Sequence, residues 1–183
     1  MSIKIEATIE DLYRVPENGK AEIVNGELVL MAATGFMPGR ASGEIYVSLR
    51  DYERCTKTGY ALPDNVGFIV NLPHRRSFSP DAAFYMGKPT GGKFLNGAPV
   101  FAAEVRSEND YGNAAEEAII TKRRDYFAAG TLVVWDVDVL KEEVVRVYRA
   151  NNPDQPQIYH RGELAEAEPA VPGWVMAVDD LFV

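Results

Sequence analysis

Four polar residues occupy places in the chain where packing alone would favour apolar side chains. Asp81 follows Pro80 inside the strand-like segment FSPDAAFYM, and Glu104 closes the apolar run PVFAAEV. Lys122 lies on the helical segment that comes next, and Glu22 lies in the first strand of an expected hairpin. Because a carboxylate at the end of a buried strand is costly unless it is paired or bound to a cation, these positions are candidates for chemistry.

The two strand carboxylates predict a divalent-metal site. On adjacent strands, Asp81 and Glu104 would converge on one Mg²⁺ or Mn²⁺ ion, with the carbonyl of Val105 as a third ligand. Lys122 or Arg106 would then orient an attacking water and stabilise a pentavalent phosphate, while the metal lowers the pKa of that water. This arrangement points to hydrolysis of a phosphate ester.

Each of these residues also has a purely structural interpretation. Asp81 after a proline fits an Asx-turn at a strand edge. Glu104 fits a strand-end carboxylate that reaches solvent or pairs with Arg106, which lies two positions further on the same side of the strand. Lys122 fits an ordinary solvated lysine on a helix.

The remaining reactive side chains show no pattern typical of catalysis. His74 and His160 lie in polar, turn-like contexts without ligand spacing, so we expect both at the surface. Cys55 has no motif around it that would make it a nucleophile. Asp136 and Asp138 alternate with apolar residues, as in a half-exposed strand.

The N-terminal third has the clearest local signals. Thr8 is followed by acidic residues and predicts the N-cap of a short helix. Asn25-Gly26 between two apolar runs is the strongest short hairpin signal, because a type I′ turn needs positive φ at both central residues. It predicts strands at about 20–24 and 27–32.

The rest of the chain alternates between helical and strand patterns. Helical spacing predicts a helix from Pro38 to Tyr52, and a second helix capped by Asn113, with Glu116 in capping-box position and Gly130 as the stop. Residues 87–97 indicate a mobile loop, and the tail predicts one more strand and a terminal turn. Further strands are expected at 60–62, 66–72, 79–86, 99–105, 131–137 and 142–148. Together these elements predict one α+β domain over residues 1–183 with a mixed sheet.

The amino-acid composition limits the class of protein and its expected location. The 183 residues are 46% hydrophobic and 25% charged, which is close to the average of globular proteins. No segment approaches the roughly 20 apolar residues of a membrane span, and the N-terminus lacks the order of a secretory signal. The single cysteine excludes an internal disulfide. We therefore expect a cytoplasmic protein with no membrane partner.

The net charge of −8 bears on nucleic-acid binding. Proteins that bind nucleic acid usually carry a basic face, because phosphate contacts supply most of the non-specific affinity. Here basic residues cluster only in the short groups 75–76 and 122–124. DNA stays a candidate partner, but tight and promiscuous binding is not expected.

The same residues carry a family resemblance. EIVNGEL at 22–28, SPD at 79–81, EVRS at 104–107, KxxxY at 122–126, AG at 129–130 and VWD at 134–136 occur in this order. In order and spacing the chain resembles, from about Thr8 to Phe182, the Uma-two family of restriction-endonuclease-like proteins within the PD-(D/E)XK superfamily.

The resemblance implies a restriction-endonuclease-like fold, in which a central mixed sheet is flanked by helices. It implies metal ligation by Asp81 and Glu104, with the lysine of the third motif moved from strand to helix as Lys122. Glu22 matches the acidic residue of the family's hairpin and is a further candidate. Two departures are the run at 107–110, Ser-Glu-Asn-Asp instead of Ser-Pro-Ser, and Arg40 where many members have histidine.

Two hypotheses of function follow. The first is a Mg²⁺-dependent nuclease that hydrolyses phosphodiester bonds of DNA. The alternative is a non-catalytic protein-interaction or regulatory module that keeps the nuclease fold, favoured by the acidic composition and the acidic run at 108–110. Hydrolysis of a smaller phosphate ester is a third option. A homodimer is one assembly to test, since a lone nuclease-like domain often dimerises to reach both strands of a duplex.

Overall fold

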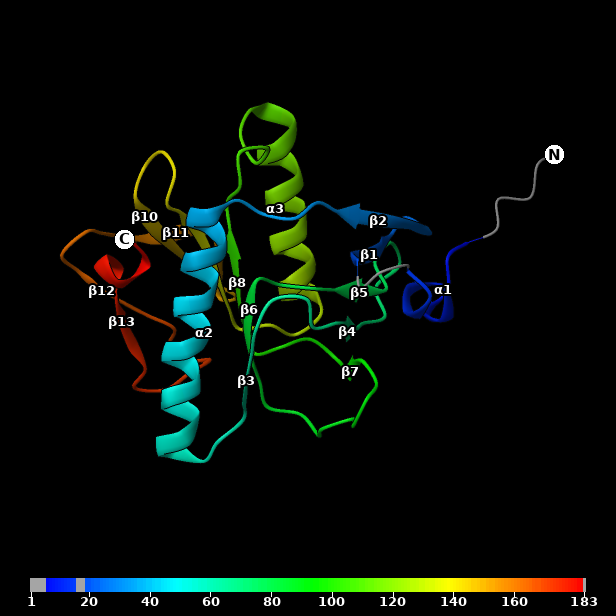
Figure 1. Cartoon of the computed structure of the whole chain (residues 1–183), viewed down its shortest axis with the longest axis horizontal. Helices are drawn as coiled ribbons and strands as arrows, with labels where there is room; N and C mark the ends of the chain where they lie inside the picture. Colours follow the sequence, from blue (N-terminus) through cyan, green and yellow to red (C-terminus); the bar gives the residue numbers. More distant parts are fainter. Residues whose placement is uncertain (1–5, 16–18, 183) are drawn as a thin grey trace.

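A six-stranded mixed sheet forms the centre of the protein in the computed structural model, which describes residues 6–15 and 19–182. Figure 1 shows the sheet with helices packed around it. The strands follow the order β11-β10-β9-β8-β6-β3. Their bounds are β3 Tyr60–Leu62, β6 Ala82–Tyr85, β8 Phe101–Val105, β9 Val133–Asp138, β10 Val144–Arg149 and β11 Asn152–His160. Strands β8 and β9 are parallel, and the other neighbours in this sheet are antiparallel.

Three small sheets surround the central one. They consist of β1 Lys20–Val24 with β2 Glu27–Met31, of β4 Phe68–Ile69 with β5 Ser77–Phe78 and β7 Leu95–Asn96, and of β12 Leu164–Glu166 with β13 Val175–Ala177. A short helix, α1 Ile9–Tyr13, precedes the first hairpin, and a 3-10 helix, η2 Val178–Leu181, follows β13. The predicted α+β fold, with a mixed sheet and an N-terminal hairpin, is confirmed.

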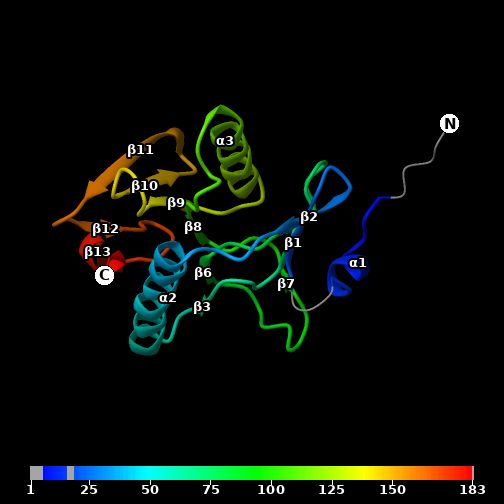
Figure 2. The ribbon, with the colours of Figure 1, turned by 45° about the horizontal axis from the view of Figure 1, so that its top comes forward.

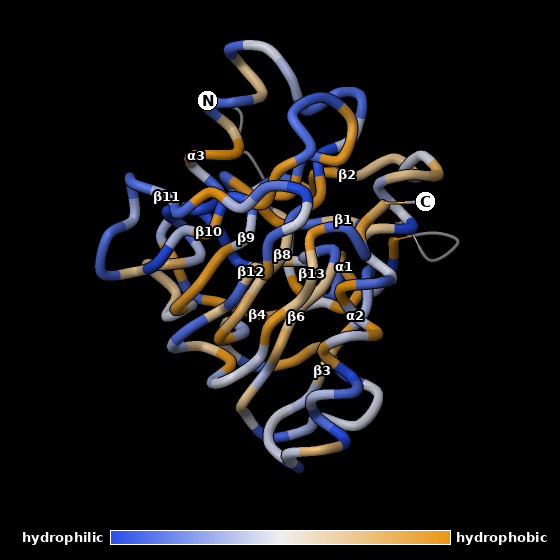
Figure 3. Tube along the Cα trace, turned by 90° about the vertical axis from the view of Figure 1, so that its left-hand side faces the viewer, coloured by the Kyte–Doolittle hydropathy of each residue, from blue (hydrophilic) through white to orange (hydrophobic). Residues whose placement is uncertain are grey.

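Two long helices cover opposite faces of the sheet, as Figure 2 shows. Helix α2 (Phe36–Thr56) buries Ile45 and Leu49 in one apolar core together with Trp135 of β9. Helix α3 (Asn113–Ala128) packs Tyr126 into a second core, where it meets Val134 of the same strand. Because successive side chains of a strand point to opposite faces, β8 and β9 contribute side chains alternately to the two cores. Figure 3 shows this hydrophobic centre along the inner strands.

Strand β9 is buried along its whole length, so the expectation that Asp136 and Asp138 belong to a half-exposed strand is wrong. The alternation of acidic and apolar residues is real, but the acidic side faces α3 and the loop before it instead of solvent. Tyr111 from that loop donates a hydrogen bond to Asp138 at 2.8 Å. Alternation shows which residues share a face; it does not show what covers that face.

The hairpin prediction is confirmed. Asn25 and Gly26 both have positive φ, at 51° and 74°, which suits the turn between β1 and β2. The hairpin stands apart from the central sheet and is attached through β5, where Ser77 Oγ accepts the Ile23 N–H at 2.8 Å and Arg76 N–H binds the Ile23 carbonyl at 3.0 Å. This attachment holds the inner strand of the hairpin against the site described below.

Helix boundaries differ in instructive ways from the predictions. Thr8 caps α1 with a capping box, as expected. Helix α2 extends beyond the predicted 38–52 at both ends, since Pro38 is tolerated in a first turn. Helix α3 is not capped by Asn113: Gly112, with φ 94°, is its N-cap, and Glu116 binds a distant arginine instead of the backbone.

Several strand predictions were too long or too simple. The expected strand 66–72 is paired only at β4, and the expected strand 79–86 begins at β6, after a break at Ser79–Asp81. Pro80 lies in this break, and a proline has no N–H to donate to a ladder. The predicted loop 87–97 contains β7, and the tail forms β11, β12, β13 and η2 instead of one strand and a turn.

None of the helices in the described ranges is long and apolar enough to cross a membrane.

Leu49→Ala tests the packing of α2 on the sheet. Leu49 is fully buried, so the variant should lose about 2–5 kcal/mol of unfolding free energy through the cavity that it leaves. Val47→Ala on the same helix is the control, because Val47 is 51% exposed and its truncation should change stability by less than about 0.5 kcal/mol. Urea unfolding followed by circular dichroism measures both values; equal losses would contradict the packing described.

Candidate functional site

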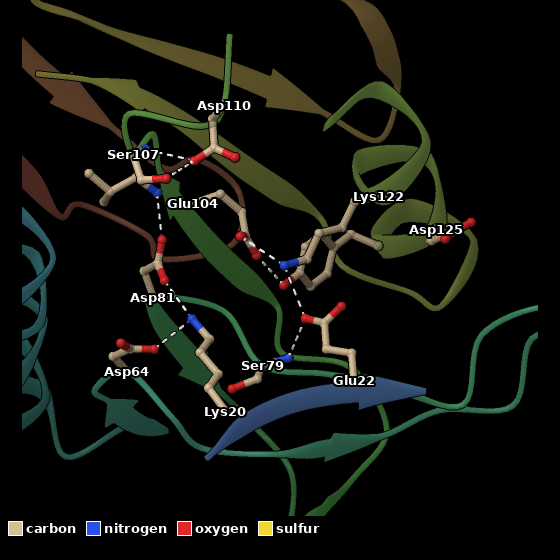
Figure 4. A network of polar contacts seen from close by, with 12 residues as sticks. Lys20, Glu22, Asp64, Ser79, Asp81, Glu104, Ser107, Asp110, Lys122 and Asp125 are labelled. Carbon is tan, nitrogen blue, oxygen red and sulfur yellow. Dashed lines mark hydrogen bonds and ion pairs between the residues drawn. The ribbon is translucent and has the colours of Figure 1, made fainter. Parts of the chain in front are cut away.

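Asp81 and Glu104 lie at the same end of two neighbouring strands. Ala82 of β6 pairs with Ala103 of β8 in antiparallel register, and each carboxylate belongs to the next residue outward from this pair. The Asp81 N–H binds the carbonyl of Ala103 at 3.1 Å, and Asp81 Oδ2 accepts the N–H of Val105 at 2.8 Å. Figure 4 shows Asp81 turned toward Lys20 of the hairpin and Glu104 turned toward Lys122 of α3.

Asp81 is paired with a lysine of the hairpin. Lys20 Nζ lies 2.6 Å from Asp81 Oδ1 and 2.7 Å from Asp64 Oδ1. Asp64 belongs to the turn after β3, where its Oδ1 also accepts the Asn65 N–H at 2.6 Å. One ammonium therefore joins two carboxylates from different parts of the chain.

Glu104 is held by two side chains of α3. Lys122 Nζ donates to Glu104 Oε2 at 2.9 Å, and the hydroxyl of Tyr126 donates to Oε1 at 2.6 Å. The two donors are four residues apart and so lie one above the other on the same helix face. Tyr126 also stacks on Phe78 at 4.0 Å between ring centroids, which fixes its position in the core.

Glu22 connects Lys122 to the buried side chain of Arg75. Its Oε1 accepts the N–H of Ser79 at 2.8 Å and lies 3.0 Å from Lys122 Nζ. Its Oε2 lies 2.5 Å from Arg75 Nη1, and Arg75 Nε in turn binds Asp125 at 2.7 Å. The Glu22 side chain is only 4% exposed, so its charge depends on these partners.

The predicted surface positions of both histidines are confirmed, since His74 and His160 are exposed. His74 nevertheless has a partner: its Nε2 lies 2.6 Å from Asp125 Oδ1 at the outer end of the network. Cys55 is exposed.

Burial and like charge act together on the protonation of the site. Burial raises the pKa of Glu104; Lys122 opposes this shift, and the neighbouring charge of Asp81 adds to it. Burial would lower the pKa of Lys122, but the carboxylates of Glu104 and Glu22 outweigh it and raise that pKa. The pKa of Tyr126 is raised by burial and by Glu104, so its hydroxyl stays a proton donor.

The network has more acidic than basic groups. Its carboxylates are Glu22, Asp64, Asp81, Glu104 and Asp125, and its basic side chains are Lys20, Arg75 and Lys122. Among the described residues, five carboxyl groups thus stand beside three basic side chains and the imidazole of His74. A hard divalent cation would add positive charge beside these carboxyl groups.

Comparison with known proteins gives the family and the fold. The model of the Uma2 family, described as "Putative restriction endonuclease", matches residues 8–179. The chain belongs to the Uma2 family. A crystal structure of a "putative nuclease belonging to DUF820" from Anabaena variabilis ATCC 29413 has the same fold, with a TM-score of 0.74 and 17% identity over 96% of this chain and 97% of that one. No curated protein matches the chain.

Of the residues predicted for this Uma2 site, the structure brings together Asp81, Glu104, Lys122 and Glu22, with Val105 adjoining through its N–H. It places Arg106 elsewhere. The guanidinium of Arg106 binds Asp136 through Nε at 2.6 Å and Nη2 at 2.7 Å, and its other side binds Glu116. The alternative interpretation, in which Arg106 is the ion-pair partner of Glu104, is therefore wrong, and a phosphate contact from Arg106 stays a prediction.

The two departures from the Uma2 pattern lie outside the network. The acidic run at 107–110 closes on itself, since Asp110 Oδ2 accepts both the N–H and the hydroxyl of Ser107, at 2.6 and 2.7 Å. Arg40 pairs with Glu44 on α2 at 2.7 Å. Neither change adds a charge to the carboxylates of the site.

Four charged members of the network were not predicted from the sequence: Lys20, Asp64, Arg75 and Asp125. Lys20 did carry a signal, because it lies two residues before Glu22 on β1 and so shares its face of the strand. Asp64 lies in a turn and Arg75 in an isolated β-bridge with Val24, where no periodicity indicates the direction of a side chain.

Within the described ranges, no three His, Cys, Asp or Glu side chains form a group that would hold a metal. The candidate metal site therefore consists of two carboxylates and would need backbone and water ligands. This is the usual condition of Mg²⁺, which keeps several waters and takes one or two carboxylates.

Arg106→Leu tests whether this residue holds β8 and β9 to the start of α3. The variant leaves Asp136 buried without its main partner, so we expect a loss of about 3–5 kcal/mol of unfolding free energy. Arg54→Leu is the control, because Arg54 and its partner Asp51 are exposed and their pair should contribute less than about 1 kcal/mol. Chemical denaturation measures both; a small effect at Arg106 would show that its two carboxylates find other partners.

Proposed function

We propose that the protein is a nuclease that hydrolyses phosphodiester bonds of DNA with Mg²⁺ or Mn²⁺. The observation that carries this proposal is the meeting of Asp81 and Glu104 at the same end of β6 and β8, with Lys122 held on Glu104. Membership of the Uma2 family supports the reaction class, and the fold shared with the "putative nuclease" of Anabaena variabilis is consistent with it.

The residues present fit a divalent metal of this kind. Asp81 and Glu104 would hold the ion, together with the carbonyl of Val105, and the excess of acidic over basic groups in the network favours its binding. When bound, such an ion lowers the pKa of a water and neutralises charge on the phosphate.

The chain's own residues have separate tasks in this proposal. Lys122 stays protonated and is positioned between Glu104 and Glu22, from where its ammonium would orient the attacking water. Tyr126 donates a hydrogen bond to Glu104 and fixes the carboxylate without taking part in proton transfer. Glu22 positions Lys122, and its own orientation is set by Arg75 and the N–H of Ser79.

The second candidate is a protein-interaction module without catalysis. One observation favours it: each prospective ligand already has a lysine of the chain beside it, Lys20 at Asp81 and Lys122 at Glu104. Such pairs hold the fold together without a metal. Metal binding therefore separates the two candidates more sharply than fold does.

Metal titration with Asp81→Asn tests the ligand assignment. At a Mn²⁺ concentration of about 100 times the Kd, the wild-type protein should gain about 2.7 kcal/mol of stability, and the variant should lose most of this gain. Asp51→Asn on the exposed face of α2 should keep it. Thermal unfolding with and without Mn²⁺ provides the measurement, and an unchanged gain in Asp81→Asn would assign the metal elsewhere.

Lys122→Met tests the catalytic lysine. Single-turnover cleavage of a DNA substrate in Mg²⁺ should fall by about 10²–10³-fold, because one preorganised charged donor is lost at the reacting phosphate. The Mn²⁺-induced stabilisation should remain, which separates loss of chemistry from loss of metal.

Arg124→Met is the matched control on the same helix, since Arg124 is largely exposed. It should cleave at the wild-type rate. Wild-type cleavage by Lys122→Met, with its fold verified by circular dichroism, would exclude Lys122 from the chemistry.

A further inference from the structure

The inner strand of the hairpin supplies two charged side chains to the site. Lys20 and Glu22 are two residues apart on β1, so both point to the same side of the strand. Figure 4 shows Lys20 directed at Asp81 while Glu22 is directed at Lys122. The site therefore contains two lysines, one beside each prospective metal ligand.

The two lysines differ in what surrounds them. Lys122 lies between Glu104 and Glu22, and Glu22 is almost fully buried and held by Arg75. Its ammonium is fixed from the interior side. Lys20 instead lies between Asp81 and Asp64, and 42% of the Asp64 side chain is exposed. The two lysine side chains are about equally exposed, at 15% for Lys20 and 19% for Lys122. Asp64 is the most exposed of their carboxylate partners, and it marks the Lys20 side as the edge of the network where a polyanion would approach.

An ammonium has three donors, and with residues of the described ranges Lys20 makes two contacts, to Asp81 and Asp64. The Lys20 side chain is 15% exposed, so it is only partly accessible to solvent. With a dication on Asp81, Lys20 would share this carboxylate with a like charge and be repelled from it. Asp64 would still hold its other side, and the nearest new anion would be a phosphate of the substrate.

We propose that Lys20 is a second functional lysine, which contacts a backbone phosphate of the nucleic acid at the open edge of the site. This inference rests on the proposed function, because it takes a nucleic acid as the substrate. Lysine binds phosphate as a point charge, so the contact selects the polyanion and its register, not a base sequence. The pair of Lys20 with Asp81 is then the resting arrangement of a substrate-binding side chain.

The salt dependence of DNA binding tests this contact directly. A labelled single-stranded DNA oligonucleotide is titrated by fluorescence anisotropy in Ca²⁺ over a range of KCl, with cleavage checked to be absent. Lys20→Met should lower the slope of log K against log salt by about 0.7, the value of one phosphate contact on a single strand. Lys20→Arg keeps the charge and should keep the slope.

Cleavage provides the second readout. In Mg²⁺ the single-turnover rate of Lys20→Met should fall by about 10–100-fold, as expected for the loss of one charge-assisted hydrogen bond. The stabilisation by Mn²⁺ should not weaken, because Lys20 is no ligand. Lys88→Met, in the exposed loop after β6, is the control and should match the wild type in slope and rate.

Each result bears on the inference. If the wild type binds and cleaves DNA while Lys20→Met keeps its slope and rate, Lys20 is a structural ion-pair partner and the proposed function stands. If the wild type does not cleave but Lys20→Met still lowers the slope, the phosphate contact is supported and the proposed function fails. If the wild type binds no DNA at any salt concentration, both are wrong.

Discussion

The site depends on one constraint: its carboxylates are removed from bulk water and must be paired. The chain meets this requirement with charges that alternate in sign, from Asp64 through Lys20 to Asp81, and from Glu104 through Lys122 to Glu22 and Arg75. Buried ion pairs are weak evidence for stability, because apolar replacements of the same volume are often as stable. Their concentration at one end of β6 and β8 is better explained by function, for which perturbed and paired carboxylates are typical.

A second charged network on the same face of the sheet sets the geometry of the first. Arg106 follows β8 directly, binds Asp136 of β9, and reaches Glu116 in the first turn of α3. Helix α3 therefore starts at a fixed point relative to the strand that carries Glu104. Because Lys122 and Tyr126 lie further along the same rigid helix, their distances to Glu104 follow from this attachment. Arg106 thus bears on the site as a positioning residue, without touching its carboxylates.

The parts of this structure that the sequence predicted are those with local causes. The turn at Asn25-Gly26 follows from backbone sterics, and the strand that carries Glu104 follows from an apolar run. Lys20 was missed because its partner lies 61 residues away, and nothing in its own neighbourhood shows which charge it will meet. Asp136 was placed in a half-exposed strand for the same reason: the alternation was visible, but the arginine that covers it comes from another strand end. Which charged residues pair with one another depends on the tertiary structure. In the sequence, only the order of the family's motifs indicated any of these pairings.

The position of the lysines also reconciles an acidic protein with a phosphate-binding role. A net charge of −8 disfavours non-specific attraction of DNA over the whole surface. In the resting site Lys20 and Lys122 are neutralised by the carboxylates, so the site offers no attraction of its own until a dication shares those carboxylates. Affinity for a polyanion would then arise at the place of reaction and only in the metal-bound state. Under the proposed function, the excess of acidic residues suppresses unproductive binding, and the same ion pairs that stabilise the resting fold keep both phosphate-directed cations in position.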